Sequence, residues 1–404
     1  MMKDKVVILG VTGGIAAYKA AELVRLLVKG GARVHVIMTK AAQHFVSPLT
    51  FQTLSGNPVH TELFNLIEEQ EIGHISLAER ADLVLIVPAT ANFIGKLASG
   101  IADDLLATTV MATRAPVLLA PAMNTAMYQN PVYRENQEKL LRHGYHFVPP
   151  ATGMLACGWE GEGKLQEPSV ILEEAFNLLS LKDLKGEKVL VTAGPTREEL
   201  DPIRFFSNYS SGKMGYALAR AARRRGAEVT LVTGPVSLEA PWGVDIVRVT
   251  SAYEMLDAVL RVFPEMTVVI KTAAVADYRP EERSPGKIKK SETPLTVRLV
   301  KNPDILAELG KTKGNRFLVG FAAETGEIGA NAPQKLQQKN LDLIVANDVT
   351  RAGAGFAVDT NIVTLYFKDG RSEELSLMGK DELADVILDR IVAALGQKRE
   401  KENG

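Results

Sequence analysis

The segment PAMNTAMY (121–128), which follows the apolar run APVLLA, carries the clearest chemical signal of the first half of the chain. Asn124 lies there between two methionines, and its amide can both donate and accept hydrogen bonds. Thr90 and Asn92, in PATANFIGK (88–96), place further polar side chains directly after another apolar run. Because open α/β sheets bind ligands beyond the carboxyl ends of their strands, these segments predict the wall of a binding site. Helix capping by Thr90 or Asn92 is the alternative explanation.

A glycine-rich turn, VTGGIAAYK (11–19), separates the first apolar run from the first helical pattern. Gly13 and Gly14 allow a ligand to approach the backbone closely, and the amino end of a helix favours an anion. The turn does not match the GxGxxG pattern of dinucleotide-binding proteins. It is consistent either with an anion site or with a purely structural turn.

Two further side chains could transfer protons. His74, in EIGHISLAERAD, is expected at or near the start of a helix, and Cys157 is the only cysteine of the chain. Cys157 lies in ATGMLACGWEGEGK (151–164), a long glycine-rich loop of a kind that often covers a site. A reactive thiol needs exposure and a favourable electrostatic environment. A single histidine or cysteine is more commonly structural, so an inert role is the alternative for both.

Polar residues also follow the apolar runs of the second half. Arg204 and Asn208 lie in a loop that leads to SSGKMG, which has the pattern of a capped helix start. This glycine-rich segment does not match the P-loop pattern. Asp277 lies in KTAAVADY, directly after the apolar run TVVI. Their positions at strand ends predict a second ligand site.

Several lysines of the second half could bind an anion. Lys287 and Lys289 belong to KIKK, which follows a loop rich in proline and glycine. Lys335 and Lys339 are four residues apart, and this spacing places both on one face of a helix. A solvated surface is the alternative for KIKK, whereas an anion clamp would suit a phosphorylated ligand.

These residues need a sheet to bring them together, and short apolar strands alternate with helical patterns in both halves. The clearest strand runs lie at 81–90, 115–121, 145–149, 267–270, 317–320 and 342–346, and a helix is expected over about 212–225. The alternation predicts an α/β protein with two doubly wound, mostly parallel-sheet, Rossmann-like domains. The charged connector LKDLKGEKVL places the domain boundary near 182–186.

Composition limits the classes of function. The chain has 404 residues, which exceeds one ordinary core, and its formal net charge is −1. The absence of a long basic run argues against binding to nucleic acid or to a membrane surface. A single cysteine excludes an intrachain disulfide and favours a reducing compartment. The opening segment resembles neither a signal peptide nor a membrane span, so we expect a cytoplasmic protein.

Taken together, GGIAAYK, His74, PATANFIGK, PAMNTAMY and the cysteine-bearing loop resemble the flavin-dependent cysteine decarboxylases over about 1–180. The resemblance implies that residues 1–183 form an FMN-dependent phosphopantothenoylcysteine decarboxylase domain. The residues that would bind FMN are Gly13, Gly14, Ile15, Thr39, Thr90 and Asn92.

The same resemblance implies a reaction. In this family the substrate thiol is oxidised to a thioaldehyde with the help of FMN, and that group is the electron sink that decarboxylation needs. By resemblance His74 is the basic residue of this stage and Asn124 binds the substrate carboxylate. Cys157 would donate the proton in the final reduction, and Met123 would line the substrate site.

AAVADY followed by KIKK, together with SNYSSGKMG and AAET, resembles the phosphopantothenate–cysteine ligases over roughly 186–395. The resemblance implies that residues 184–404 form a CTP-dependent ligase domain. CTP would activate a carboxylate as an acyl-cytidylate, with Mg²⁺ bound through the CTP phosphates. Asn208 would hold either the intermediate or the phosphopantothenate side, and Lys287 would act while the acyl-cytidylate forms. The other residues that would bind substrate or CTP are Arg204, Ala273, Asp277, Lys289, Pro303, Asp304, Ile305, Leu306, Phe321, Lys335 and Lys339.

The order of the two halves matches the bacterial bifunctional coenzyme A biosynthesis family. The partners implied are small molecules, namely phosphopantothenate, cysteine and CTP. The resemblance also implies a homo-oligomer, and trimeric decarboxylase units combined with dimeric ligase units would make a dodecamer.

Two other functions are alternatives. A two-domain NAD(P) oxidoreductase should carry GxGxxG with an acidic residue about 20 positions further on, and the chain lacks this pattern. A flavin electron carrier with an interaction domain would leave Asn124, Cys157 and KIKK without a role.

Overall fold

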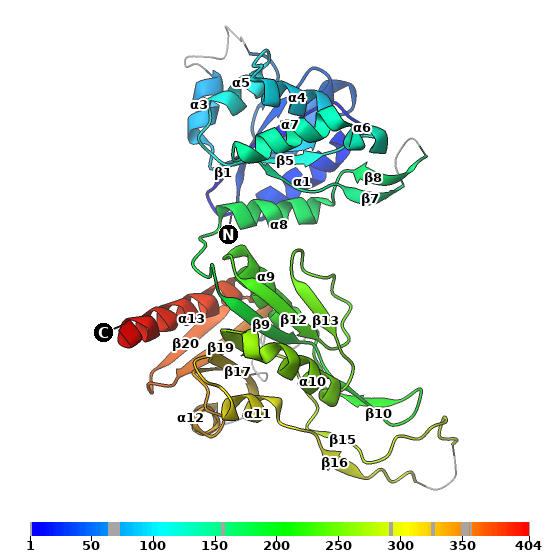
Figure 1. The fold of residues 1–404 in the computed structure, drawn as a ribbon, viewed down its shortest axis with the longest axis vertical. Helices are drawn as coiled ribbons and strands as arrows, with labels where there is room; N and C mark the ends of the chain where they lie inside the picture. Colours follow the sequence, from blue (N-terminus) through cyan, green and yellow to red (C-terminus); the bar gives the residue numbers. More distant parts are fainter. Residues whose placement is uncertain are drawn as a thin grey trace. The chain divides into compact units, whose positions relative to one another are not determined.

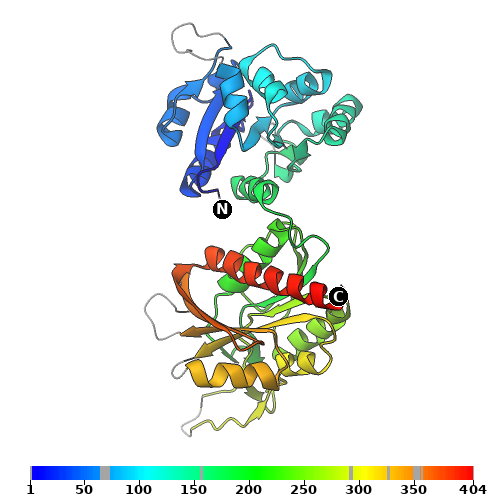
Figure 2. The same ribbon diagram turned by 90° about the vertical axis from the view of Figure 1, so that its left-hand side faces the viewer.

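The structure is a computed structural model that describes residues 2–63, 73–154, 158–290, 294–324, 328–348, 355 and 358–403. The chain folds as two compact units, Met1–Ser180 and Leu181–Gly404. The colours of Figures 1 and 2 run from blue to green through the first unit and from green to red through the second.

The N-terminal unit is built on a six-stranded parallel sheet in the order β3-β2-β1-β4-β5-β6. Its strands are β1 (Val6–Val11), β2 (Arg33–Met38), β3 (Val59–His60), β4 (Leu83–Ala89), β5 (Val117–Pro121) and β6 (His146–Phe147). The strand order reverses between β1 and β4. Doubly wound sheets bind ligands at such a switch point, so the topology itself indicates where a site should lie.

Helices cover both faces of this sheet (Figure 1). They are α1 (Ala17–Lys29), α2 (Pro48–Ser55), α3 (Gly73–Arg80), α4 (Ala91–Ser99), α5 (Leu105–Ala112), α6 (Thr125–Gln129), α7 (Pro131–Arg142) and α8 (Pro168–Leu179), with a 3₁₀ turn at Ala42–His44. Alternate residues of β1 belong to opposite cores. Leu9 packs with α1 and α8, whereas Ile8 packs with α4, α5 and α7. Burial on both faces explains why β1 is a continuous apolar run.

Residues 151–164, which were expected to form a loop, contain an antiparallel hairpin of β7 (Ala151–Met154) and β8 (Glu160–Lys164). The N–H of Met123 donates to the carbonyl of Gly163 at 2.9 Å. A Cβ at Gly163 would lie 2.3 Å from the Met123 oxygen, so glycine is what allows this approach. The hairpin is thereby docked on the segment that carries Asn124. Cys157 lies outside the described residues.

The C-terminal unit contains an eight-stranded sheet in the order β13-β12-β9-β14-β17-β18-β19-β20. Its strands are β9 (Lys188–Ala193), β12 (Glu228–Thr233), β13 (Asp245–Arg248), β14 (Val268–Lys271), β17 (Phe317–Glu324), β18 (Leu343–Asp348), β19 (Thr360–Phe367) and β20 (Ser372–Gly379). The first six in the sheet pair in parallel, and β19 and β20 add an antiparallel edge. The switch point of this sheet lies between β9 and β14.

The helices of this unit also cover both faces of its sheet. They are α9 (Lys213–Arg224), α10 (Ala252–Val262), α11 (Ile305–Lys311), α12 (Ile328–Gln338) and α13 (Lys380–Asn403), with a 3₁₀ turn at Phe263–Glu265. α9 and α13 share one core, while α10, α11 and α12 share the other. In Figure 2 α13 is the red helix that lies along one face of the sheet.

Two small hairpins extend from the C-terminal sheet. They are formed by β10 (Arg197–Glu199) with β11 (Phe205–Ser207) and by β15 (Tyr278–Pro280) with β16 (Leu299–Lys301). Residues 287–290 lie in the segment between β15 and β16. Among the described residues, no helix combines the length and the apolar character that crossing a membrane requires.

The predicted α/β class, with two doubly wound and mostly parallel sheets, is confirmed. The antiparallel edge strands β19 and β20 were not predicted. They follow the last parallel strand, and buried residues alternate with partly exposed ones along β19, as in an antiparallel strand with only one face on the core.

Candidate active sites

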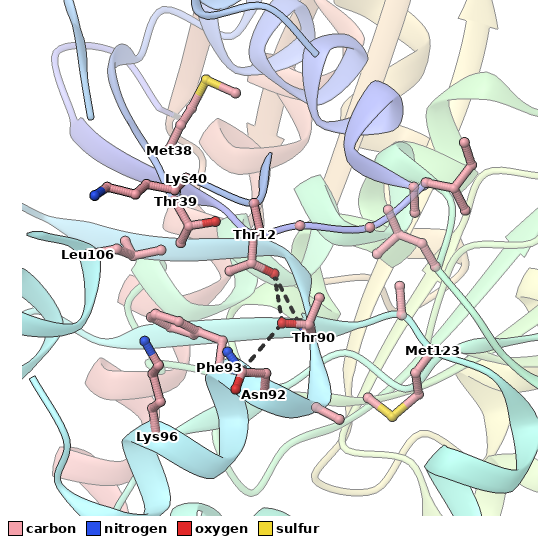
Figure 3. Close-up of a pocket in the computed structure, with 18 of the residues that line it drawn as sticks. Thr12, Met38, Thr39, Lys40, Thr90, Asn92, Phe93, Lys96, Leu106 and Met123 are labelled. Atoms are coloured by element: carbon pink, nitrogen blue, oxygen red, sulfur yellow. Dashed lines mark hydrogen bonds between the residues drawn. The ribbon is translucent and has the colours of Figure 1, made fainter. Parts of the chain in front are cut away.

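The N-terminal unit has a cavity of about 1190 Å³ at the carboxyl ends of its central strands (Figure 3). All six residues predicted to bind the cofactor line this cavity, and so do Met123 and Asn124. They come from the turn after β1, the end of β2, the start of α4 and the segment after β5. The parallel sheet therefore brings together residues that are distant in sequence.

Thr12 and Thr90 join the two sides of the switch point. The Thr12 hydroxyl donates to the carbonyl of Pro88 at 2.7 Å and accepts the backbone N–H of Thr90 at 3.1 Å. The two hydroxyl oxygens are 3.2 Å apart, and Figure 3 shows both side chains at the cavity. Thr90 also caps α4, because its hydroxyl accepts the N–H of Phe93 at 3.4 Å. Thr90 thus meets both alternatives, as a cap and as part of the cavity wall.

The glycine pair lets the loops after β1 and β2 meet at the cavity. A Cβ at Gly13 would lie 2.4 Å from the Cβ of Ala41, whereas one at Gly14 would have its nearest neighbour, in Thr90, at 3.8 Å. α1 begins directly after this turn with no side-chain cap at Ala16. The turn is therefore open to an anion at a helix start.

A compact ionic group forms part of the same wall. Lys96 contacts Asp103 at 2.6 Å and Asp104 at 3.1 Å, and all three residues line the cavity. The hydrogen bond from Lys96 to Asp103 raises the pKa of the lysine, although burial opposes this. The lysine therefore stays cationic, and the two carboxylates offset its charge.

Asn124 is held by the start of α6. Its side-chain oxygen accepts the N–H of Ala126 at 2.8 Å, as the N-cap of that helix. The cap fixes the amide in the cavity wall, close to the β7–β8 hairpin. The sequence pattern thus predicted a site residue that is also a structural cap.

His74 and Cys157 are not among the described residues that line the cavity. His74 is the second residue of α3, and its buried Nδ1 has no hydrogen-bond partner among the described residues. Their roles stay predictions.

The C-terminal unit has a second cavity, of about 420 Å³. Seven of the predicted residues line it, namely Asn208, Ala273, Asp277, Leu306, Phe321, Lys335 and Lys339. Six of the predicted residues do not line this cavity, namely Arg204, Lys287, Lys289, Pro303, Asp304 and Ile305. Asn208 lies beside the loop after β14, because its amide donates to the carbonyl of Val275 at 3.0 Å.

Asp304 reaches this cavity through Lys339. Their side chains are 2.7 Å apart, and Asp304 also caps α11 by accepting the N–H of Ala307 at 3.0 Å. Burial alone would raise the pKa of Asp304, but these hydrogen bonds and the charges of Lys339 and Lys271 lower it. The carboxylate is therefore ionised and offsets the charge of Lys339.

Lys271 is a cavity residue that the sequence analysis did not single out. It ends β14, next to the switch point, and lines the cavity. Burial lowers its pKa to about 8; Asp304 and Asp277 oppose the shift, and Lys339 adds to it. The sequence feature that could have indicated Lys271 is a charged residue at the end of an apolar strand, in TVVIK.

Asp201 anchors the segment that contains KIKK. Its buried carboxylate accepts N–H groups of Ile203 and Arg204 at 2.8 Å and of Ile288 at 3.1 Å. Arg204 donates to this carboxylate at 3.0 Å and to the carbonyl of Ile288 at 2.6 Å. Burial alone would raise the pKa of Asp201, but these bonds lower it to about 2. Arg204 therefore fixes the backbone next to Lys287 and Lys289, whose own side chains are exposed.

The described part of the chain contains no cluster of three or more histidine, cysteine or acidic side chains that could hold a metal ion. From the sequence, Mg²⁺ is expected to bind through the CTP phosphates, and Asp277 is expected to contact the nucleotide either directly or through the metal.

Comparison with known proteins identifies the family. Residues 1–180 match the flavoprotein family, and residues 184–395 match the C-terminal domain family of DNA/pantothenate metabolism flavoproteins. The chain is 51% identical to the coenzyme A biosynthesis bifunctional protein CoaBC of Bacillus subtilis (strain 168), over 99% of this chain and 100% of that protein. The chain belongs to the CoaBC family. It is also 50% identical to CoaBC of Vibrio cholerae, over 96% of this chain and 98% of that protein.

A solved structure of the C-terminal domain of a CoaBC protein is 46% identical to this chain, with a TM-score of 0.47. The match covers 54% of this chain and 99% of the chain in that structure. Membership of the CoaBC family confirms the predicted resemblance. It favours neither an NAD(P) oxidoreductase nor an electron carrier.

Proposed function

We propose that this CoaBC-family chain catalyses two consecutive reactions of coenzyme A biosynthesis. The C-terminal unit joins cysteine to phosphopantothenate at the expense of CTP. The N-terminal unit then decarboxylates phosphopantothenoylcysteine to phosphopantetheine, with FMN as cofactor. The observation that carries the proposal is the near-complete match to CoaBC proteins, supported by two cavities at the switch points of the two sheets.

The N-terminal cavity fits FMN. Its volume of about 1190 Å³ leaves room for a cofactor and a substrate together. The glycine turn and the start of α1 would receive the phosphate, since helix amino ends favour anions. Thr39, Thr90 and Asn92 offer polar atoms, and Ile15, Met38 and Leu106 offer apolar surface for the ring system. When bound, FMN supplies a two-electron acceptor that makes the substrate thiol a carbonyl-like electron sink.

The residues of the chain orient the substrate in this cavity. Asn124 binds the carboxylate that is lost, because its oxygen is occupied by the α6 cap and its amide nitrogen is a donor. Met123 and Met127 form apolar wall beside it. His74 does not line the cavity of its own unit, so it would act as the basic residue of the oxidative stage from a neighbouring protomer of the proposed homo-oligomer. Cys157 would return a proton in the last step.

In the C-terminal unit the chain must stabilise a highly charged nucleotide. A carboxylate is a poor electrophile, and CTP activates it as an acyl-cytidylate with release of pyrophosphate. Lys335 and Lys339 neutralise phosphate charge in the cavity, and Mg²⁺ accompanies the triphosphate. Asn208 holds the intermediate, and Lys287 acts while it forms, supported by the anchor at Asp201. The substrate and nucleotide site also includes the remaining predicted residues, namely Arg204, Ala273, Asp277, Lys289, Pro303, Asp304, Ile305, Leu306 and Phe321.

We assign the two activities to residues 1–183 and 184–404. We also propose a cytoplasmic homo-oligomer, with the dodecamer as the expected assembly.

Two point variants separate the two reactions. With phosphopantothenate, cysteine, CTP and Mg²⁺, Lys287→Gln should lose phosphopantothenoylcysteine formation but still decarboxylate added phosphopantothenoylcysteine. Cys157→Ser should form phosphopantothenoylcysteine and then stall at or before the final reduction. Mass spectrometry of the products distinguishes these outcomes. Unchanged CTP turnover in Lys287→Gln would contradict the ligase assignment, and normal phosphopantetheine yield in Cys157→Ser would contradict the role of the thiol.

A further inference from the structure

Lys271 stands apart from the other cations of the C-terminal cavity. Lys339 is paired with Asp304 at 2.7 Å. By contrast, no hydrogen bond or ion pair of the Lys271 amine is found among the described residues, although this side chain lines the cavity. A lysine that lines a cavity without a protein partner is available to a ligand.

Lys271 lies at the switch point of the C-terminal sheet. It is the last residue of β14, where it is in register with Thr192 of β9 and Gly320 of β17. β9 and β14 flank the switch point, and anionic ligands of doubly wound sheets bind there. The charged groups that face Lys271 are Asp277 from the loop after β14, Asp304 at the start of α11, Lys335 from α12 and Lys339 from the turn directly after α12.

The balance of these charges favours an anion. Three lysines and one aspartate line the cavity, and Asp304 adds a second carboxylate that is committed to Lys339. Two carboxylates against three ammonium groups leave an excess of one positive charge when all are ionised. A polyphosphate would offset this excess and give the Lys271 amine a hydrogen-bonded anionic partner, which none of the described residues provides.

We infer that Lys271 binds a phosphate group of the nucleoside triphosphate, as a further cation of the ligase site beyond the residues predicted from the sequence. The inference rests on the proposed ligase function. It implies that the nucleotide binds to the protonated amine of Lys271. Because burial lowers the pKa of this amine to about 8 in the nucleotide-free protein, binding near pH 8 should cause Lys271 to take up a proton.

Calorimetric titration of the full chain with CTP and Mg²⁺ tests this, in the absence of cysteine and phosphopantothenate. At pH 7.5, Lys271→Met should weaken CTP binding about 10- to 100-fold, the usual range for a lost charge-assisted hydrogen bond. At pH 8, wild type should take up about half a proton per CTP, measured in buffers of different ionisation enthalpy. Lys271→Arg should bind CTP without this proton uptake, since arginine is charged throughout.

Two features of the design exclude a structural explanation. Lys311→Met is the control, because Lys311 is exposed on α11 and pairs with Glu308 outside the cavity; it should behave as wild type. Lys271→Arg keeps the positive charge. If Lys271→Met folds poorly, the proton uptake of Lys271→Arg on CTP binding still tests whether Lys271 binds the phosphate. The terminal phosphate of CTP does not interfere, because phosphate esters lose their second proton near pH 6.

The outcomes separate the inference from the proposed function. Wild-type affinity in Lys271→Met, or undiminished proton uptake in Lys271→Arg, would overturn the role of Lys271 and leave the ligase proposal standing. A wild-type chain that binds no CTP would overturn both.

Discussion

Thr12 and Thr90 are 78 residues apart in the chain, yet their hydroxyl oxygens lie 3.2 Å from each other at the switch point of the N-terminal sheet. One follows β1 and the other follows β4, the two neighbouring strands at which the chain order reverses. The contact shows how the topology of a parallel sheet converts two separate turns into one wall of a cavity.

The first prediction concerns this threonine pair. Thr90→Val removes both the α4 cap and the contact with Thr12, so it should lower the free energy of unfolding by about 1–2 kcal/mol. Thr12→Val should cost a similar amount, and the double variant should cost less than the sum, since the two side chains interact. Urea denaturation followed by circular dichroism measures all three. If the losses of unfolding free energy in the two single variants add up to that of the double variant, the two side chains are not coupled and the prediction is wrong. Thr53→Val on α2 is the control, because its exposed hydroxyl bonds only within its own helix.

The second prediction uses the two neighbouring glycines. Gly13→Ala would place a Cβ 2.4 Å from that of Ala41 and 2.9 Å from its carbonyl carbon, so the loop after β2 must move. Gly14→Ala would keep 3.8 Å to Thr90, which is ordinary contact. We expect Gly13→Ala to be purified with little flavin and Gly14→Ala to retain it, as judged by visible absorbance per protein. Equal flavin content in both variants would show that the turn does not shape the flavin site.

The third prediction separates the two roles of Asn124. Asn124→Asp keeps an oxygen that can cap α6, but it replaces an amide donor with a negative charge that repels the substrate carboxylate. We expect unchanged thermal stability and a loss of decarboxylation of at least about 100-fold, equivalent to about 2.7 kcal/mol. Asn130→Asp is a matched control, because Asn130 caps α7 in the same way, at 2.9 Å from the N–H of Val132, without lining the cavity. Activity in Asn124→Asp equal to that of Asn130→Asp would contradict the carboxylate-binding role.

The fourth prediction concerns Asp201. Asp201→Asn should weaken the anchor of the KIKK segment and reduce CTP-dependent ligation, while decarboxylation of added phosphopantothenoylcysteine persists. Because its folded pKa of about 2 lies below the unfolded value of about 4, the stabilisation from Asp201 is present above pH 4. It is lost as the pH falls toward 2.

Thermal unfolding of wild type and Asp201→Asn at pH 7 and pH 3.5 checks the sign of this effect. The gap in midpoint between the two proteins should be larger at pH 7. A gap that grows in acid would mean that the carboxylate is not the stabilising form. Asp369→Asn is a suitable control for the ligation assay, since Asp369 is an exposed residue whose ion pair with Arg371 lies outside the ligase cavity.

The strand ends could be predicted from the sequence because parallel strands that are buried on both faces are continuous apolar runs. VVILG and LVLIVPA gave β1 and β4, and the polar residues just beyond them had to meet at one edge. Thr90 and Asn124 could therefore be predicted as residues of a site wall, and both line the cavity.

Other features depend on pairings that no local pattern reveals. The ion pair between Asp304 and Lys339 joins the start of α11 to the turn after α12. The two residues are 35 positions apart, and no sequence pattern predicts such a contact. The β7–β8 hairpin was missed because glycines interrupt its alternation, and those glycines make sense only against Met123 and Thr125. Asp201 and Lys271 were missed because their importance comes from burial beside particular neighbours.

The central claim is that one chain carries both reactions in sequence. The most direct test incubates the purified full-length protein with phosphopantothenate, cysteine, CTP and Mg²⁺, records its visible spectrum and follows product masses over time. The account predicts a yellow protein that first accumulates phosphopantothenoylcysteine and then converts it to phosphopantetheine, with CTP consumed in proportion to the amide formed. A colourless protein that stops at phosphopantothenoylcysteine would contradict the flavin half, and the absence of both products would contradict the account as a whole.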